Sequence, residues 1–160
     1  MINPKILDAL NTQVNQELNS YYLYLDMANW FAYKNLDGFA KLTKKQSDEE
    51  KSHADKIMKY ITDLDEQVVL KPLQEPRKSW NTALEIFTCA YESEEKTTHY
   101  LTQIAKLAIS ENDLRTVSFL DWFLIEQIEE EKSTNEVMTQ LKMIGDDQTG
   151  LLLLNEKLNK

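Results

Sequence analysis

The 160-residue sequence contains few residues that end or cross-link secondary structure: three glycines, three prolines and one cysteine, Cys89. Scarce turn formers beside many strong helix formers favour an all-α protein. A single cysteine excludes disulfides within the chain and metal sites built from clustered cysteines. The length suits one domain with a sizeable core, so we expect a single domain over residues 1–160.

Long apolar runs and an excess of positive charge are also lacking. The longest aliphatic run, Leu151 to Leu154, is far too short to span a bilayer, and no apolar signal segment opens the sequence. The net charge of -9 argues against nucleic-acid binding, because phosphate contacts need clustered cations. We therefore expect a cytoplasmic protein that binds neither a membrane nor nucleic acid.

Four long helices and a short fifth one are predicted. Short connections at residues 33–36 and 110–112 pair the first helix with the second, and the third with the fourth, as antiparallel hairpins. The segment 65–81 contains two prolines and lacks a helical period. Extended, it reaches roughly 55 Å, more than the ~42 Å of a 28-residue helix, so it can cross the whole bundle. Asn81 is the expected N-cap of the third helix. The predicted helices span about residues 4–33, 37–64, 82–110, 113–144 and 149–158.

Each long helix carries apolar residues at alternating spacings of three and four, which is typical of a bundle core. Near the middle of every stripe, acids, an amide or an imidazole interrupt the apolar residues. An unpaired buried carboxylate is costly, and no lysine or arginine lies on the stripes, so a bound cation is the natural partner. The second stripe also includes Gln46. The interrupting side chains that we select as ligands are Glu17, Glu50, His53, Glu94, Gln127 and Glu130.

The spacing of these residues supports one shared site. Glu17 and Glu50 are 33 residues apart, as are Glu94 and Gln127, so each pair lies at one height of its hairpin. The two predicted hairpins also carry similar motifs, Glu50-x-x-His53 in the first and Gln127-x-x-Glu130 in the second. Residues at i and i+3 share a helix face. The pattern indicates an approximate internal duplication. Oxygen-rich ligation with one imidazole suits iron or manganese.

Over its whole length the sequence resembles the non-haem bacterial ferritins, through the five-helix pattern, the crossover and the ligand set. The resemblance implies a ferritin-like four-helix bundle that oxidises Fe(II) with O₂ or H₂O₂ and stores the product as mineral inside a homo-oligomeric cage of 24 subunits. It also implies two irons per subunit, with Glu50 as the bridging ligand. By the same resemblance, Glu17, Glu50 and His53 bind the first iron, and Glu94 and Glu130 bind the second, beside Gln127.

The resemblance extends to residues around the two irons. It implies that Tyr24, next to the ligands, is an electron donor. The alternative is that Tyr24 is a core tyrosine without a redox role. It also implies a third iron site, and here the alternative is a solvated acidic face. Trp122 either packs under that site or is an ordinary core residue. The third-site ligands would be Glu49, Glu126 and Glu129, with Glu130 shared.

Departures from related families narrow the prediction. Bacterioferritins place a haem-binding methionine directly after the bridging glutamate, where this chain has Lys51, so no haem is expected.

Two other classes of function stay open. One is a di-metal carboxylate oxidoreductase acting on another substrate, which needs a pocket that the compact stripes do not predict. The other is a bundle that is purely structural or binds iron passively. His99 and Cys89 receive no role in any of these.

Overall fold

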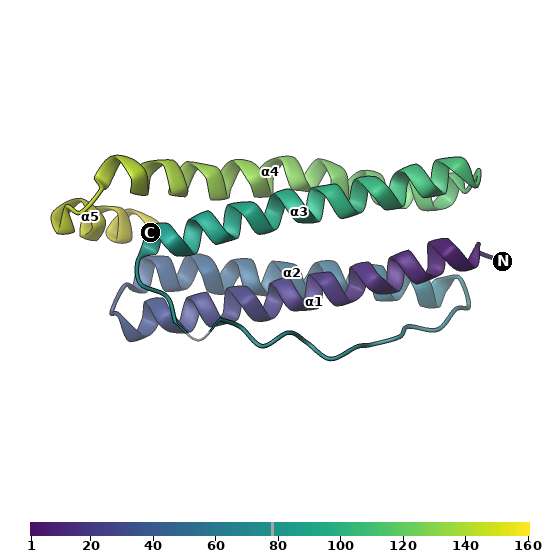
Figure 1. The fold of residues 1–160 in the computed structure, drawn as a ribbon, viewed down its shortest axis with the longest axis horizontal. Helices are drawn as coiled ribbons and strands as arrows, with labels where there is room; N and C mark the ends of the chain where they lie inside the picture. The colour runs from purple at the N-terminus through teal and green to yellow at the C-terminus, as the bar shows by residue number, and fades with distance from the viewer. Residues whose placement is uncertain (78) are drawn as a thin grey trace.

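The structure is a computed structural model that describes residues 1–77 and 79–160 (Figure 1). Two antiparallel helical hairpins lie one over the other, and a short helix follows at one end. No strand occurs among the described residues. This confirms the predicted all-α four-helix bundle with a fifth C-terminal helix. The helices are α1 (Pro4–Tyr33), α2 (Asp37–Asp63), α3 (Ala83–Ser110), α4 (Leu114–Ile144) and α5 (Gln148–Leu158).

Side chains just before α1, α3, α4 and α5 cap the first turns of these helices, whereas α2 has no side-chain cap. Asp113 caps α4 by accepting from the backbone N–H of Thr116. The N-cap prediction for α3 was wrong by one residue, because Thr82 accepts from the backbone N–H of Glu85. The Glu85 carboxylate turns back and accepts from the backbone N–H of Asn81. Asn81 therefore donates a hydrogen bond to the cap but is not itself the N-cap. The other predicted helix ends lie within one residue of those observed.

The crossover runs along the outside of the bundle beside α1 (Figure 1). Three asparagines spaced four residues apart on α1 hold its backbone, and we call them the asparagine ladder: Asn11, Asn15 and Asn19. Four helical residues advance about 6 Å and two extended residues advance about 6.6 Å, so the step from Asn11 to Asn15 matches the step from Val69 to Lys71, whereas the step to Asn19 takes three crossover residues. The ladder donates to the carbonyls of Gln67 and Val69 and accepts from the N–H groups of Val69, Lys71 and Gln74.

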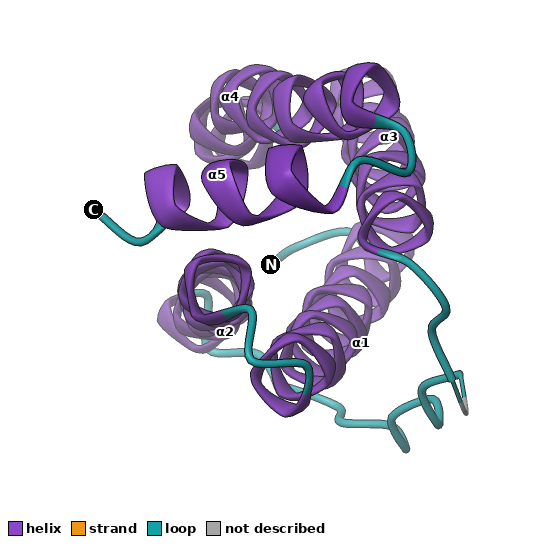
Figure 2. Ribbon diagram, turned by 90° about the vertical axis from the view of Figure 1, so that its left-hand side faces the viewer, coloured by secondary structure: helices purple, strands orange, loops and turns teal. Residues whose placement is uncertain are grey.

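The bundle core consists of two apolar clusters with a polar layer between them. One cluster lies near α5 and stacks Phe31 on Phe39, with ring centroids 5.0 Å apart. The other, at the opposite end, includes Leu10, Ile57 and Leu120. α1 packs directly on α3, whereas α2 and α4 lie farther apart, with α5 between them at one end (Figure 2). The two clusters fix the helices above and below the polar layer.

The Asn155 side chain attaches α5 to the start of α2 by two hydrogen bonds. The Asn155 side-chain oxygen accepts from the backbone N–H groups of Gly38, at 2.8 Å, and Phe39, at 3.2 Å. A Cβ atom at Gly38 would lie 1.8 Å from the Asn155 carbonyl oxygen, so this close approach requires glycine. Leu154 is buried against the core, but Leu152 and Leu153 are exposed. None of the described helices is both long and apolar enough to cross a membrane.

Candidate metal centre

The structure brings the predicted ligands of all four long helices into one buried layer. Glu17 comes from α1, Glu50 and His53 from α2, Glu94 from α3, and Gln127 and Glu130 from α4. Among these six residues, two groups of three have ligand atoms within 4.8 Å of one another. Glu50 belongs to both groups, which is the position that a bridging carboxylate requires. The groups are Glu17–Glu50–His53 and Glu50–Glu94–Glu130.

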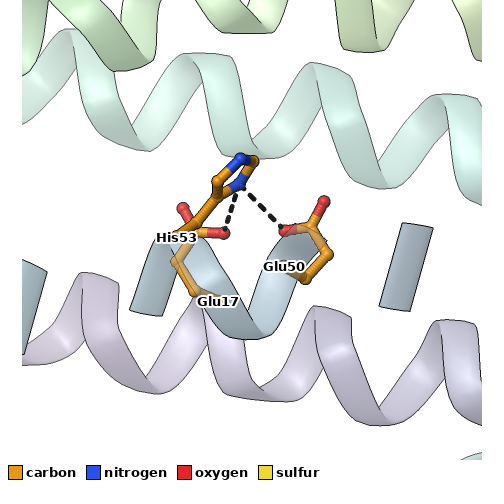
Figure 3. A group of neighbouring side chains, drawn as sticks. All are labelled: Glu17, Glu50 and His53. Carbon is orange, nitrogen blue, oxygen red and sulfur yellow. Dashed lines mark ion pairs between the residues drawn. The ribbon is translucent and has the colours of Figure 1, made fainter. Parts of the chain in front are cut away.

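In the first group, one buried carboxylate oxygen forms an ion pair with His53 but accepts no hydrogen bond among the described residues (Figure 3). His53 Nδ1 lies 3.8 Å from Glu17 Oε2 and 3.7 Å from Glu50 Oε2, too far for hydrogen bonds. Gln13 donates to the other oxygen of Glu17 at 2.9 Å. Within the described part of the chain, the buried Glu17 Oε2 accepts no hydrogen bond. An unpartnered buried oxygen facing a carboxylate and an imidazole suits ligation of a cation.

The second group is largely satisfied by protein donors. The Tyr24 hydroxyl donates to one oxygen of Glu94 at 2.5 Å, and the Gln127 amide donates to the other at 3.2 Å. Gln46 donates to Glu130 and, at 3.4 Å, to Glu50. No lysine or arginine in residues 1–77 or 79–160 forms an ion pair with any of the four carboxylates. The negative charge of the layer therefore has His53 as its only titratable counter-charge among those residues.

Burial and mutual repulsion shift the pKa values within the layer. Burial raises the pKa of Glu50 well above its usual range, and the charges of Glu17 and Glu94 raise it further. Burial and Glu94 together raise the pKa of Glu130 to about 7. Burial lowers the pKa of His53, but Glu17 and Glu50 outweigh it and raise that pKa to about 11. The layer thus holds protons that a bound cation would displace.

Tyr24 lies beside the carboxylates of the second group, next to the predicted ligands as the family resemblance implies. Burial, followed by the charge of Glu94, raises the pKa of Tyr24 well above its usual range. Its hydroxyl therefore stays protonated and donates to Glu94. A role as electron donor stays a prediction.

The residues predicted to form the third site are only partly brought together. Glu126 has a ligand atom within 4.8 Å of His53 and Glu130. Glu49 is half-buried and lies 3.7 Å from Lys45, and Glu129 is exposed. Neither Glu49 nor Glu129 joins a metal-ligand group among the described residues. The third site stays a prediction.

Trp122 is not a core residue, because 41% of it is exposed. Its ring meets His53 edge-on at 5.5 Å between centroids, and Lys56 Nζ lies 3.4 Å from the ring centroid. The aromatic ring therefore covers one side of the ligating imidazole.

Sequence reasoning gave no role to two glutamines that orient the ligands. Gln13 and Gln46 each stand four residues before a ligand, Glu17 and Glu50, and donate to it. The shared Gln-x-x-x-Glu spacing is the signal that could have identified them, since i and i+4 residues are neighbours on a helix. Thr98 also escaped notice, although its hydroxyl accepts from the Gln127 amide at 3.2 Å.

Comparison with known proteins agrees with this geometry. Residues 7–144 match the family described as the ferritin-like domain. A bacterial non-heme ferritin of Staphylococcus saprophyticus is 35% identical over 158 residues, which covers 99% of this chain and 95% of that protein. One of Campylobacter jejuni is 30% identical over 156 residues, with 98% and 93% covered. A solved open pore ferritin of Archaeoglobus fulgidus is similar with a TM-score of 0.97 and 36% identity, with 99% and 98% covered.

Proposed function

The chain belongs to the ferritin family of iron-storage proteins, and from this premise we propose that it oxidises Fe(II) to Fe(III) in its buried carboxylate layer. The observation that carries the proposal is Glu17 Oε2, a buried oxygen that accepts no hydrogen bond within the described chain and faces Glu50 and His53. A purely structural layer would not leave such an atom unpaired. Iron is the substrate and cargo of this reaction.

The two groups support a proposal of two irons per subunit. Glu17 and His53 hold the first iron, Glu94 and Glu130 hold the second, and Glu50 bridges them. Gln127 orients Glu94 beside the second iron, and Tyr24 lies close enough to supply an electron. The proposed third iron is held by Glu49, Glu126, Glu129 and Glu130.

The protein contributes charge, geometry and proton release to the reaction. Four carboxylates in a buried layer stabilise Fe(III) more than Fe(II), because the higher cationic charge gains more from them. Gln13 and Gln46 hold two of these carboxylates in place. Iron binding displaces the protons held on Glu50 and His53. Two Fe(II) ions then lose one electron each, and one O₂ takes up two electrons and two protons to leave as hydrogen peroxide.

Storage requires assembly, and we propose a homo-oligomeric cage of 24 subunits. The exposed Leu152 and Leu153 on α5 support this, because adjacent exposed leucines on a surface helix favour burial at an interface. Light scattering that finds a monomer or a dimer would contradict the cage. We place the reaction in the cytoplasm, where Fe(II) stays reduced, and expect no haem, since Lys51 follows Glu50.

The test is aerobic addition of two Fe(II) per subunit to the purified metal-free protein, followed by stopped-flow absorbance. We expect oxidation faster than in buffer, with a ferric product. Slow, buffer-like oxidation together with tight iron binding would leave a passive iron-binding bundle. Fast consumption of O₂ that depends on an added organic compound would instead indicate a di-metal oxidoreductase.

A further inference from the structure

A groove of about 220 Å³ lies beside the metal centre, between α2 and α4. We call it the α2–α4 groove. It occupies the side of the bundle where these two helices do not pack directly (Figure 2). Leu158 of α5 also lines it. Its walls include Leu42 and Gln46 from α2 and Thr134 and Val137 from α4.

The surface of the groove is mainly carbon, although several lining residues carry hydroxyls. Thr43 donates to the Phe39 carbonyl at 2.8 Å, and Thr134 donates to the Glu130 carbonyl at 2.7 Å. These hydroxyls are engaged by their own helices. Glu136, which is exposed, is the one acid among the lining residues found in the described chain. A hydrated cation needs several oxygen ligands and would gain little from a single exposed carboxylate. The groove therefore suits a small apolar molecule.

The inner wall of the groove is formed by side chains that contact the iron ligands. Gln46 lines the groove, and its amide donates to Glu50 and Glu130. Tyr24 also lines it, and its hydroxyl donates to Glu94. A molecule in the groove is therefore one side chain away from both ligand groups.

We propose that the α2–α4 groove admits dioxygen to the metal centre and that Gln46 is the positioning residue at its inner end. This inference rests on the proposed ferroxidase function. Dioxygen is apolar and smaller than the groove, so it loses little on leaving water. Hydrogen peroxide donates and accepts hydrogen bonds in water and would leave them unpaired against carbon walls. The groove thus selects dioxygen over peroxide.

A cavity-filling variant tests the path. Leu42→Trp places a large side chain in the groove without altering a ligand, and Leu107→Trp is the matched control, because Leu107 is a half-buried leucine of α3 in the distant apolar cluster. Each protein is loaded anaerobically with two Fe(II) per subunit and mixed with O₂ or with H₂O₂. We expect Leu42→Trp to slow oxidation by O₂ at least tenfold and to leave oxidation by H₂O₂ unchanged. The control should keep both rates.

Xenon binding gives a readout that is independent of turnover. Crystals of the metal-free protein under xenon pressure should show xenon in the groove of the original chain and of Leu107→Trp, and none in Leu42→Trp. Equal loss of both oxidation rates in Leu42→Trp would overturn the inference, since the variant would then have disturbed iron binding. An unchanged O₂ rate with xenon displaced would also overturn it. A parent protein inactive with both oxidants refutes the proposed function, and the inference with it.

Discussion

The two hairpins place equivalent residues at equivalent heights but leave them in different states. In the α3–α4 hairpin, Glu94 receives hydrogen bonds from Tyr24 and from the Gln127 amide. In the α1–α2 hairpin, Glu17 Oε2 accepts none within the described chain, and His53 Nδ1 stands 3.8 Å away from it. One half of the layer is satisfied by protein groups, and the other half is not.

The difference shows how a repeated frame can produce two unequal sites. The spacing of the helices is common to both halves, but the residue at the bridging register is a glutamate in one half and a glutamine in the other. An amide donates to its neighbour, whereas a carboxylate repels it and needs a cation. We therefore expect the α1–α2 half to bind the first iron and the α3–α4 half to bind the second more weakly.

Removing the imidazole of the first half should have the largest effect. His53→Ala deletes one ligand of the tighter iron and should slow the rapid phase of oxidation about 10³-fold, or about 4 kcal/mol. Stopped-flow absorbance measures it, with Glu95→Ala as the control, since Glu95 is an exposed acid next to Glu94. A His53→Ala protein that oxidises iron at the original rate would remove the first site from the mechanism.

Giving the α3–α4 hairpin a glutamate at the register of Glu50 should destabilise the metal-free protein. Gln127→Glu replaces a donor to Glu94 with a second buried charge, which should lower the free energy of unfolding by about 3 kcal/mol. Redox-inert Zn(II) should restore most of this loss. Urea unfolding with and without zinc measures both values. Gln103→Glu, at an exposed position of α3, should change neither.

The pH dependence of stability should reveal the buried protons. The folded pKa of Glu130 is raised to about 7 from an ordinary value of 4.5, so the folded protein binds more protons than the unfolded chain between these values. Glu130 alone should therefore lower the free energy of unfolding of the metal-free protein by about 3 kcal/mol as pH rises from 4.5 to above 7. Glu50 and His53, whose pKa values are also raised, add to this fall, so Glu130→Gln should reduce the slope, whereas Glu111→Gln at an exposed position should keep it. Identical pH dependence of stability in the original protein and both variants would contradict the raised pKa of Glu130.

The smallest effect is expected at the tyrosine that joins the halves. Tyr24→Phe removes the hydrogen bond to Glu94 and should lower the free energy of unfolding by about 1 kcal/mol. Oxidation should slow a few-fold if the hydroxyl also supplies an electron. Parallel urea unfolding and stopped-flow measurements separate the two roles. A stability loss with an unchanged rate would leave Tyr24 as a structural donor only.

The residues of the buried polar layer could be predicted because each of them breaks a strong local pattern. A carboxylate in an apolar stripe is conspicuous, and the equal spacing across two short turns aligns such residues without knowledge of the packing. Gln13 and Gln46 were harder to recognise, because glutamine is an ordinary helix residue and only the geometry shows which group it contacts. The α2–α4 groove depends on how far apart two helices lie, which no single helix encodes.

The asparagine ladder escaped prediction for a different reason. Its hydrogen bonds join residues 54 to 58 positions apart, and asparagine on a helix surface carries no signal of such a partner. A loop normally tolerates added residues. One residue inserted between Val69 and Gln74 would put the Asn19 side chain opposite the wrong backbone group.

The crossover therefore has a fixed length. This length determines where the α3–α4 hairpin begins relative to α1. The height of Glu94 along the bundle, relative to Glu17, is thus set on the exterior of the molecule, by amides that lie outside the buried layer. Shortening or lengthening this segment would change the reactivity of the centre without altering a single ligand.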